Sequence, residues 1–232
     1  MDNLIALVTG ANKGIGKEIA RQLADAGHTV YLGSRDAERG QQAVGEIGGD
    51  TRLLVLDVTD EASVAAAARS IDALDILVNN AGISGENRTS EQAGAAEFRR
   101  IYETNVFGVV SVTNAALPAL RSSAHPRIVN ISSSTGSLTR AAVAGAGGFA
   151  AYRSSKAALN AITIFYAATL AEDGIKVNAL APGLRRTGLN TRAAASDGDP
   201  AEAAAGAVRL ALLPDDGPTG QFRDWDGTEL PW

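Results

Sequence analysis

The feature that most constrains the fold is a repeated alternation of short apolar runs with longer helical patterns. The first run, 4–8, is apolar throughout, which is typical of a parallel strand buried on both faces. Apolar residues then recur at helical spacing from Ile15 to Ala26, and Gly27 is suited to end that helix. Further runs of strand length cover 28–32, 53–56, 75–78, 127–131 and 175–180.

Helical patterns separate these runs. They are an Ala-rich helix capped by Asp60, one or two helices over about 91–121, and a helix over 152–170. Strands that alternate with helices imply right-handed crossovers and a parallel sheet. The sequence therefore predicts a single α/β domain over 1–232, with a doubly wound parallel sheet and helices on both faces, a Rossmann fold. Ligands of such folds bind beyond the carboxyl ends of the strands.

Composition excludes several classes of protein. The 232 residues are 45% hydrophobic and carry a net charge of -5, which argues against disorder and against a nucleic-acid partner. Because no apolar run is long enough to span a bilayer, we expect no membrane partner. The chain has no cysteine and two histidines, so no metal site is predicted. No secretory leader pattern is visible, and a cytoplasmic location is expected.

Two stretches look irregular, 134–150 and 184–200, and both follow predicted strands. They should project on the ligand side of the sheet. Each is either an ordinary surface loop or a wall of the substrate site, and the alternation alone does not decide. For 184–200 we predict a substrate lid.

A glycine-bearing turn, Thr-Gly-Ala-Asn-Lys-Gly-Ile-Gly over 9–16, lies between the first strand and the first helix. Glycine permits a tight turn and a close approach of the backbone to a phosphate. The following helix offers unpaired N–H groups and the positive end of its dipole. The turn therefore predicts a dinucleotide site.

The spacing Gly-x-x-x-Gly-x-Gly resembles that of the short-chain dehydrogenase/reductase family, and the resemblance extends over nearly the whole chain. It includes Asn-Asn-Ala-Gly at 79–82 and a Tyr-x-x-x-Lys motif at 152–156. The turn, Ser-Arg-Asp at 34–36 and the tail at 211–220 are most similar to carbonyl-reductase-like members. The cofactor contacts implied by these motifs are Gly10, Asn12, Lys13, Gly14, Ile15, Gly16, Ser34, Arg35, Asp57, Val58, Asn79, Ala81, Gly82, Tyr152, Lys156, Pro182, Gly183 and Thr187.

The residues after the second strand favour NADP(H) over NAD(H). An acidic residue there usually holds the ribose hydroxyls of NAD, whereas an arginine suits a 2′-phosphate. This chain has Ser34 and Arg35 at that point, and Lys13 in the turn supplies a second cation. The alternative is that both cations are solvated and that Asp36 accepts from the ribose. We expect Asp36 instead to face solvent or to cap the next helix.

Tyr152 and Lys156 share one face of a helix because they are four residues apart. A lysine ammonium about 4 Å from the phenol would lower its pKa by up to about three units, toward 7. Tyr152 would then be a suitable general acid. The resemblance implies a catalytic group of Asn105, Ser133, Tyr152 and Lys156. In it, Ser133 rather than Ser132 or Ser134 holds the substrate oxygen, and Asn105 orders a water that relays protons to Lys156.

These residues predict an NADPH-dependent oxidoreductase that reduces a ketone or aldehyde. The alternatives are an alcohol dehydrogenase, a ketoacyl-type reductase with a narrow substrate, and a non-catalytic NADP(H)-binding sensor. Arg185 and Arg186 either recognise an acidic substrate or are solvated, and we expect the latter. The resemblance also implies a homodimer or homotetramer formed through the helices near 103–121 and 152–170.

Overall fold

The computed structural model describes residues 3–144 and 147–232. Within them the chain forms a seven-stranded, fully parallel sheet with the order β3-β2-β1-β4-β5-β6-β7. The strands are β1 (Ile5–Val8), β2 (Thr29–Ser34), β3 (Thr51–Val55), β4 (Ile76–Asn79), β5 (Arg127–Ile131), β6 (Lys176–Ala181) and β7 (Phe222–Asp224). The order reverses direction at β1, which lies between β2 and β4, and this is the switch point where doubly wound sheets bind ligands. The predicted fold class is confirmed.

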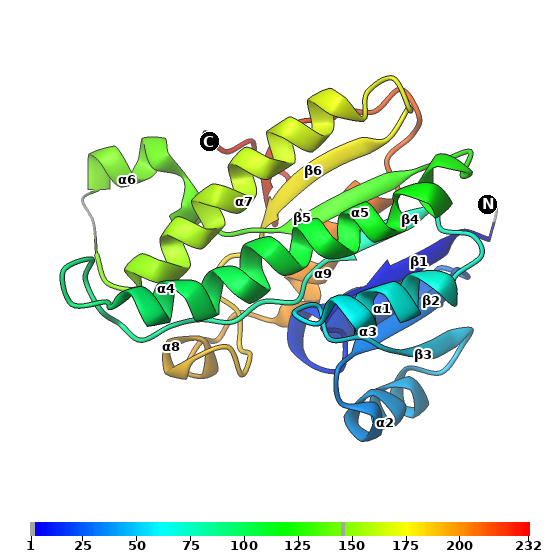
Figure 1. Ribbon diagram of the computed structural model, residues 1–232, viewed down its shortest axis with the longest axis horizontal. Coiled ribbons are helices and arrows are strands. Elements are labelled where there is room, and N and C mark those ends of the chain that lie inside the picture. Colours follow the sequence, from blue (N-terminus) through cyan, green and yellow to red (C-terminus); the bar gives the residue numbers. More distant parts are fainter. Residues whose placement is uncertain (1–2, 145–146) are drawn as a thin grey trace.

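Helices cover both faces of the sheet (Figure 1). The helices are α1 (Gly14–Asp25), α2 (Ala37–Ile47), α3 (Glu61–Arg69), α4 (Ala95–Tyr102), α5 (Gly108–Arg121), α6 (Leu138–Ala144), α7 (Ala150–Thr169), α8 (Thr191–Ala194) and α9 (Pro200–Ala211). One core joins the sheet to α1, α2 and α9, and the other joins it to α3, α5 and α7. Adjacent residues of β1 alternate between the two cores, because successive side chains of a strand point to opposite faces. This double burial explains the unbroken apolar runs of the sequence.

The helical stretch expected over 91–121 begins later, at Ala95, and is interrupted by a π-helical turn at Glu103–Phe107. That turn carries Asn105, which is fully buried. π-Helical turns are often found at functional sites.

The two stretches expected to be irregular contain short helices. α6 occupies most of 134–144, while positions 145–146 of that stretch lie outside the described residues. α8 lies within 184–200. Figure 1 shows α6 and α8 beyond the end of the sheet that is opposite the amino terminus. The sequence did not indicate β7, a three-residue strand with too few residues to produce a periodic pattern.

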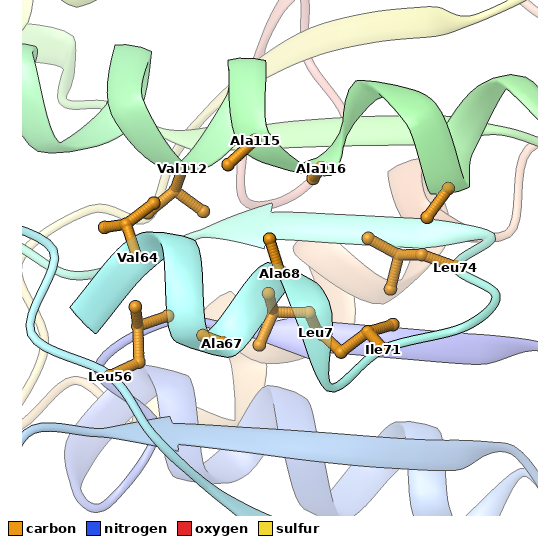
Figure 2. A pocket seen from close by; sticks show the side chains of 11 residues that line it. Leu7, Leu56, Val64, Ala67, Ala68, Ile71, Leu74, Val112, Ala115 and Ala116 are labelled. Carbon is orange, nitrogen blue, oxygen red and sulfur yellow. The ribbon is translucent and has the colours of Figure 1, made fainter. Parts of the chain in front are cut away.

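A small apolar cavity of about 20 Å³ lies between α3 and α5, above β1 (Figure 2). Side chains from both helices point into it, including Val64 and Val112, and alanines form much of its wall. All of its lining residues are apolar, and it lies within the second core, away from the strand ends. It is therefore a packing defect of the core.

Candidate active site

A cleft of about 440 Å³ opens at the carboxyl ends of the strands. Many of the predicted cofactor residues line it together. They are Gly10, Asn12, Lys13, Gly14, Ile15, Gly16, Arg35, Asp57, Val58, Ala81, Gly82, Tyr152, Lys156, Pro182 and Thr187. These residues follow β1, β2, β3, β4, β5 and β6, so the parallel topology gathers them at one edge of the sheet.

The glycine turn is tied to the loop after β4. Gly10 adopts a positive φ of 62°, and a Cβ placed on it would lie 2.9 Å from the Cα of Ala81. The Thr9 hydroxyl accepts from the backbone N–H groups of both Asn80 and Ala81, at 3.0 Å each. The Asn80 side chain donates back to the carbonyl of Thr9 at 2.9 Å. Glycine is thus required at position 10 by a close backbone approach and by its conformation.

The amino end of α1 is suited to a phosphate group. Lys13 precedes the helix in extended conformation, and among the described residues no side chain caps the first turn. Gly14 has a φ of 57° and lines the cleft. The twelve-residue helix therefore directs unpaired N–H groups and its positive dipole end at the cleft. These features fit the diphosphate of a dinucleotide.

Arg35 lines the cleft directly after β2, whereas its two neighbours do not. Ser34 is buried, and its hydroxyl donates to the carbonyl of Asp36 at 2.8 Å. The Asp36 carboxylate caps α2 by accepting from the N–H of Arg39 at 3.0 Å, as expected. Arg35 and Lys13 are therefore the cations on this side of the cleft. The pKa of Asp57 is lowered, first by the N–H of Thr59 and further by the charge of Arg35.

Tyr152 and Lys156 line the cleft from the first two turns of α7. The Nζ atom of Lys156 lies 5.8 Å from the Tyr152 ring centroid and donates to the carbonyl of Ile131 at 2.7 Å. Burial lowers the pKa of Lys156 to about 8. Burial also raises the pKa of Tyr152 to about 12, with a hydrogen bond from Ser133 acting in the opposite direction.

The prediction that Lys156 lowers the pKa of Tyr152 toward 7 is therefore wrong. The expectation assumed an ammonium about 4 Å from the phenol in a well-screened environment. Desolvation of the phenolate instead dominates. Tyr152 is a neutral phenol at neutral pH, which is the form that can donate a proton.

Ser133 follows β5 and lies near enough to the Tyr152 phenol to act against the rise of its pKa. It also exchanges a 2.8 Å hydrogen bond with the Thr135 hydroxyl. Neighbouring Ser132 is buried and donates to the Asn160 side chain, a short contact inside the fold. Of the two serines, Ser133 is the one placed for a role beside the phenol.

Asn105 is committed to hydrogen bonds within the protein. Its side chain accepts from the N–H of Ile83 at 2.9 Å and donates to the Ile83 carbonyl and the Ser155 hydroxyl, at 3.0 Å each. A Cβ on Gly82 would lie 3.4 Å from Asn105 Oδ1 and 3.7 Å from Lys156 Nζ. Asn105 thus joins the loop after β4 to α7, close to Lys156.

Asn79, Ser34, Ser133, Asn105 and Gly183 are the predicted site residues outside the lining of the cleft. Asn79 is buried and donates to Thr113 and Asn130, so its side chain joins β4 to α5 and β5. Its neighbour Asn80 lines the cleft instead. The alternation along β4 determines which of the two asparagines faces the ligand side.

Comparison with known proteins decides the family. A family model described as short chain dehydrogenase matches residues 4–198. The chain belongs to this family. It is 36% identical to (-)-isopiperitenone reductase of Mentha piperita, with 94% of this chain and 95% of that protein aligned. It is 39% identical over 198 residues to the 3-oxoacyl-acyl-carrier-protein reductase of Escherichia coli strain K12, covering 83% of this chain and 78% of that one.

Solved structures of this short-chain dehydrogenase family share the fold of this chain over nearly all of its residues. A carbonyl reductase from chicken fatty liver with bound NADPH superposes with a TM-score of 0.88 at 30% identity, covering 100% of both chains. A 3-ketoacyl-(acyl-carrier-protein) reductase from Brucella melitensis complexed with NADH gives a TM-score of 0.86 at 28% identity, covering 96% of each. The chain is therefore an oxidoreductase of the type that uses a nicotinamide dinucleotide.

Several residues that line the cleft of this short-chain dehydrogenase are not among the predicted site residues. They are Leu56, Thr59, Asn80, Ile83, Ser84, Arg100, Thr104, Ile131, Ser132, Gly188 and Leu189. Arg100 and Thr104 are four residues apart in the helical segment that also carries Asn105. This spacing places the two side chains on one side of the segment and could have indicated them. Over the described ranges, no helix is long and apolar enough to cross a membrane, and no cluster of His, Asp and Glu is suited to a metal.

Arg185 corrects the expectation of a solvated arginine. It is 7% exposed, and its guanidinium lies 4.2 Å from the ring centroid of Trp225. Nε donates to the carbonyl of Pro182 and Nη1 to Glu202, at 2.8 Å each. Because no substrate group can reach a guanidinium enclosed in this way, recognition of an acidic substrate is also unsupported for Arg185. Arg186 is exposed, as expected.

Proposed function

We propose that this protein is an NADPH-dependent reductase of ketones or aldehydes. The observation that carries the proposal is one continuous cleft with Lys13 and Arg35 toward one side and Tyr152 and Lys156 toward the other. The same cleft therefore offers two cations to an anionic cofactor and a neutral phenol that can donate a proton.

The preference for NADP(H) rests on the charges around the end of β2. Arg35 faces the cleft, and its planar guanidinium suits a 2′-phosphate. Asp36, the carboxylate that could have bound ribose hydroxyls, is engaged at the amino end of α2 and with Arg39. Lys13 adds a second positive charge from the glycine turn.

The proposed chemistry is hydride transfer with protonation of the carbonyl oxygen. A reduced nicotinamide held in the cleft would supply the hydride that the carbonyl carbon accepts. Tyr152 gives its phenolic proton to the oxygen as general acid, since the phenol is protonated at neutral pH. Ser133 donates a hydrogen bond to the same oxygen and stabilises the charge that develops there. Lys156 stabilises the phenolate that remains and orients the cofactor ribose.

The roles of the other site residues complete this proposal. Asn105 holds the water that returns protons to Lys156, through the second hydrogen bond that its Oδ1 atom can accept beside the one from Ile83. Asp57 and Val58 bind the adenine, Asn80, Ala81 and Gly82 lie along the cofactor, and Pro182 and Thr187 hold the carboxamide. Residues 184–200 close over the substrate. We also propose that 1–232 acts as a single cytoplasmic domain.

A homodimer or homotetramer is part of the proposal. Phe107 and Phe165 are 53% and 67% exposed on the segment beside α5 and on α7. Tyr166 of α7 donates to Asn114 of α5 at 2.7 Å, so the two helices are neighbours. Large exposed apolar side chains on neighbouring helices are typical of protein interfaces.

A second candidate is a dedicated ketoacyl reductase. It is favoured by the 39% identity to the Escherichia coli 3-oxoacyl-acyl-carrier-protein reductase. Both candidates share the site residues and differ in the carbonyl compound that is accepted. The same residues would also serve an alcohol dehydrogenase that works oxidatively, or a protein that binds NADP(H) as a sensor without turnover.

The deciding experiment is oxidation of NADPH and of NADH by the purified protein, with aryl ketones, ketoesters, aldehydes and a ketoacyl thioester, alongside Tyr152→Phe. We expect turnover with NADPH that falls at least about a hundredfold in the variant, the range typical of general acid catalysis. The variant should bind NADPH as the parent does. Turnover retained in Tyr152→Phe would exclude Tyr152 as the acid. Tight NADPH binding without turnover would favour the sensor.

A further inference from the structure

We propose that Arg185 is a positioning residue for the nicotinamide half of the cofactor, acting through the segment 182–189. The proposal rests on the function proposed above. Arg185 does not line the cleft, but Pro182, Thr187, Gly188 and Leu189 on either side of it do. Its own contacts, with Pro182, Glu202 and Trp225, hold this segment in place.

The guanidinium of Arg185 joins three parts of the fold. It stacks on Trp225, which directly follows β7, and it pairs with Glu202 in the first turn of α9. It also donates to the carbonyl of Pro182, which directly follows β6. β6 and β7 are paired at Ala181 and Asp224, so the two strand ends that carry these contacts are neighbours. We call Arg185, Trp225 and Glu202 the arginine clamp.

The segment held by the clamp reaches the phosphate turn. A Cβ on Gly14 would lie 3.3 Å from the Thr187 Cγ2 atom, and one on Gly188 would lie 3.9 Å from Lys13 Nζ. Displacement of the segment would therefore change the cleft at Thr187 and Leu189. A second connection, from Asn190 to Ser84 at 3.2 Å, joins it to the loop after β4.

The clamp is a costly way to fill this space, which argues for a role besides stability. Arg185 is almost completely buried, and its Nη2 atom has no hydrogen-bond partner among the described residues. The Glu202 side chain that pairs with it is half exposed, so the pair offsets only part of the cost of burying the guanidinium. A flat guanidinium on an indole, by contrast, fixes orientation as well as distance.

The sheet order predicts which half of the cofactor depends on the clamp. Arg35, the proposed ligand of the 2′-phosphate, follows β2, whereas the clamped segment follows β6. Four strand spacings separate β2 from β6, which is on the order of 19 Å. Loss of the clamp should therefore weaken contacts to the nicotinamide half and leave the adenosine half bound as before.

The test compares NADPH with adenosine 2′,5′-bisphosphate, which lacks the nicotinamide, by calorimetric titration of the full chain. We expect Arg185→Met to weaken NADPH binding about tenfold, to change adenosine bisphosphate binding by less than twofold, and to leave the Tm unchanged or raised. Arg186→Met, an exposed neighbour with the same chemical change, should alter neither affinity. Trp225→Leu should reproduce the effect of Arg185→Met, and the double variant should be no weaker than either.

Unchanged NADPH binding in Arg185→Met, or an equal loss for both ligands, would overturn the clamp's role. If Arg185→Met does not fold, Arg185→Lys applies the same comparison, because lysine keeps the charge beside Glu202 but not the planar stack. A parent protein that binds NADH but neither NADPH nor adenosine 2′,5′-bisphosphate would instead contradict the proposed cofactor, so the two failures are distinguishable.

Discussion

Lys156 directs its ammonium at the carbonyl of Ile131, 2.7 Å away, while its Nζ atom lies 5.8 Å from the centre of the Tyr152 ring. The two side chains are neighbours on α7, yet the strongest contact of the lysine is with the end of β5. Burial raises the pKa of Tyr152 and lowers the pKa of Lys156, so it favours the neutral form of both groups. The site thus keeps a protonated phenol beside a buried cation, and the cation reduces the stability of the fold.

Substituting Lys156 should therefore stabilise the protein at neutral pH. The folded pKa of about 8 is below the ordinary value of 10.5, so the folded state holds its proton less tightly than the unfolded state does. A shift of this size corresponds to about 3 kcal/mol of destabilisation while the pH is below 8. Between pH 8 and 10.5 the unfolded chain binds more protons, and the stability of the parent rises with pH.

We expect Lys156→Met to exceed the parent in free energy of unfolding at pH 7 by up to about 3 kcal/mol, with most of the difference gone at pH 10. Urea denaturation at the two pH values measures it. Lys176→Met, the same change at a less buried position, is the control and should not stabilise the protein at pH 7 to this extent. A constant difference across this range would mean that Lys156 is not desolvated as described.

Arg35 should determine the choice between the two nicotinamide cofactors. Arg35→Asp removes a cation that lines the cleft and adds a charge that repels a 2′-phosphate. We expect NADPH binding to weaken about a hundredfold, since a charged hydrogen bond contributes roughly 1.5–3 kcal/mol, while NADH binding changes little. Arg39→Asp makes the same change in the first turn of α2, at a residue paired with Asp36, and should leave the ratio of affinities unaltered. Equal losses for both cofactors in Arg35→Asp would remove the argument for NADPH.

Asp36 should affect stability rather than cofactor choice. Its carboxylate caps α2 and also pairs with Arg39 at 3.2 Å. Asp36→Ala should lower the free energy of unfolding by about 1 kcal/mol, and Asp36→Ser should recover most of that loss. The ratio of NADPH to NADH affinity should be the same in both variants. A changed ratio would show that Asp36 contacts the ribose after all.

Local patterns predicted the fold and the general position of the site, because double burial produces unbroken apolar strands. They also predicted that Asp36 would be available as a helix cap, since capping depends on neighbours in sequence. What they could not predict depends on residues distant in the chain. The burial of Arg185 requires Trp225 and Glu202, and the raised pKa of Tyr152 requires the walls of the folded cleft. Asn80 rather than Asn79 lines the cleft, because successive residues along β4 face opposite sides of the sheet.

The apolar cavity between α3 and α5 should accept one more carbon, with an effect on stability alone. Val112 points into the cavity from α5, and the surrounding wall includes several alanines (Figure 2). Val112→Ile adds one carbon to a space that the core leaves unfilled, and burying a methylene contributes about 0.8 kcal/mol. Val109→Ile adds the same carbon to a buried position on the same helix that does not line the cavity, so it should destabilise by about 1 kcal/mol or more through overpacking. Thermal unfolding of the two variants should therefore shift the Tm in opposite directions, and a lowered Tm for Val112→Ile would mean that the cavity does not admit another carbon.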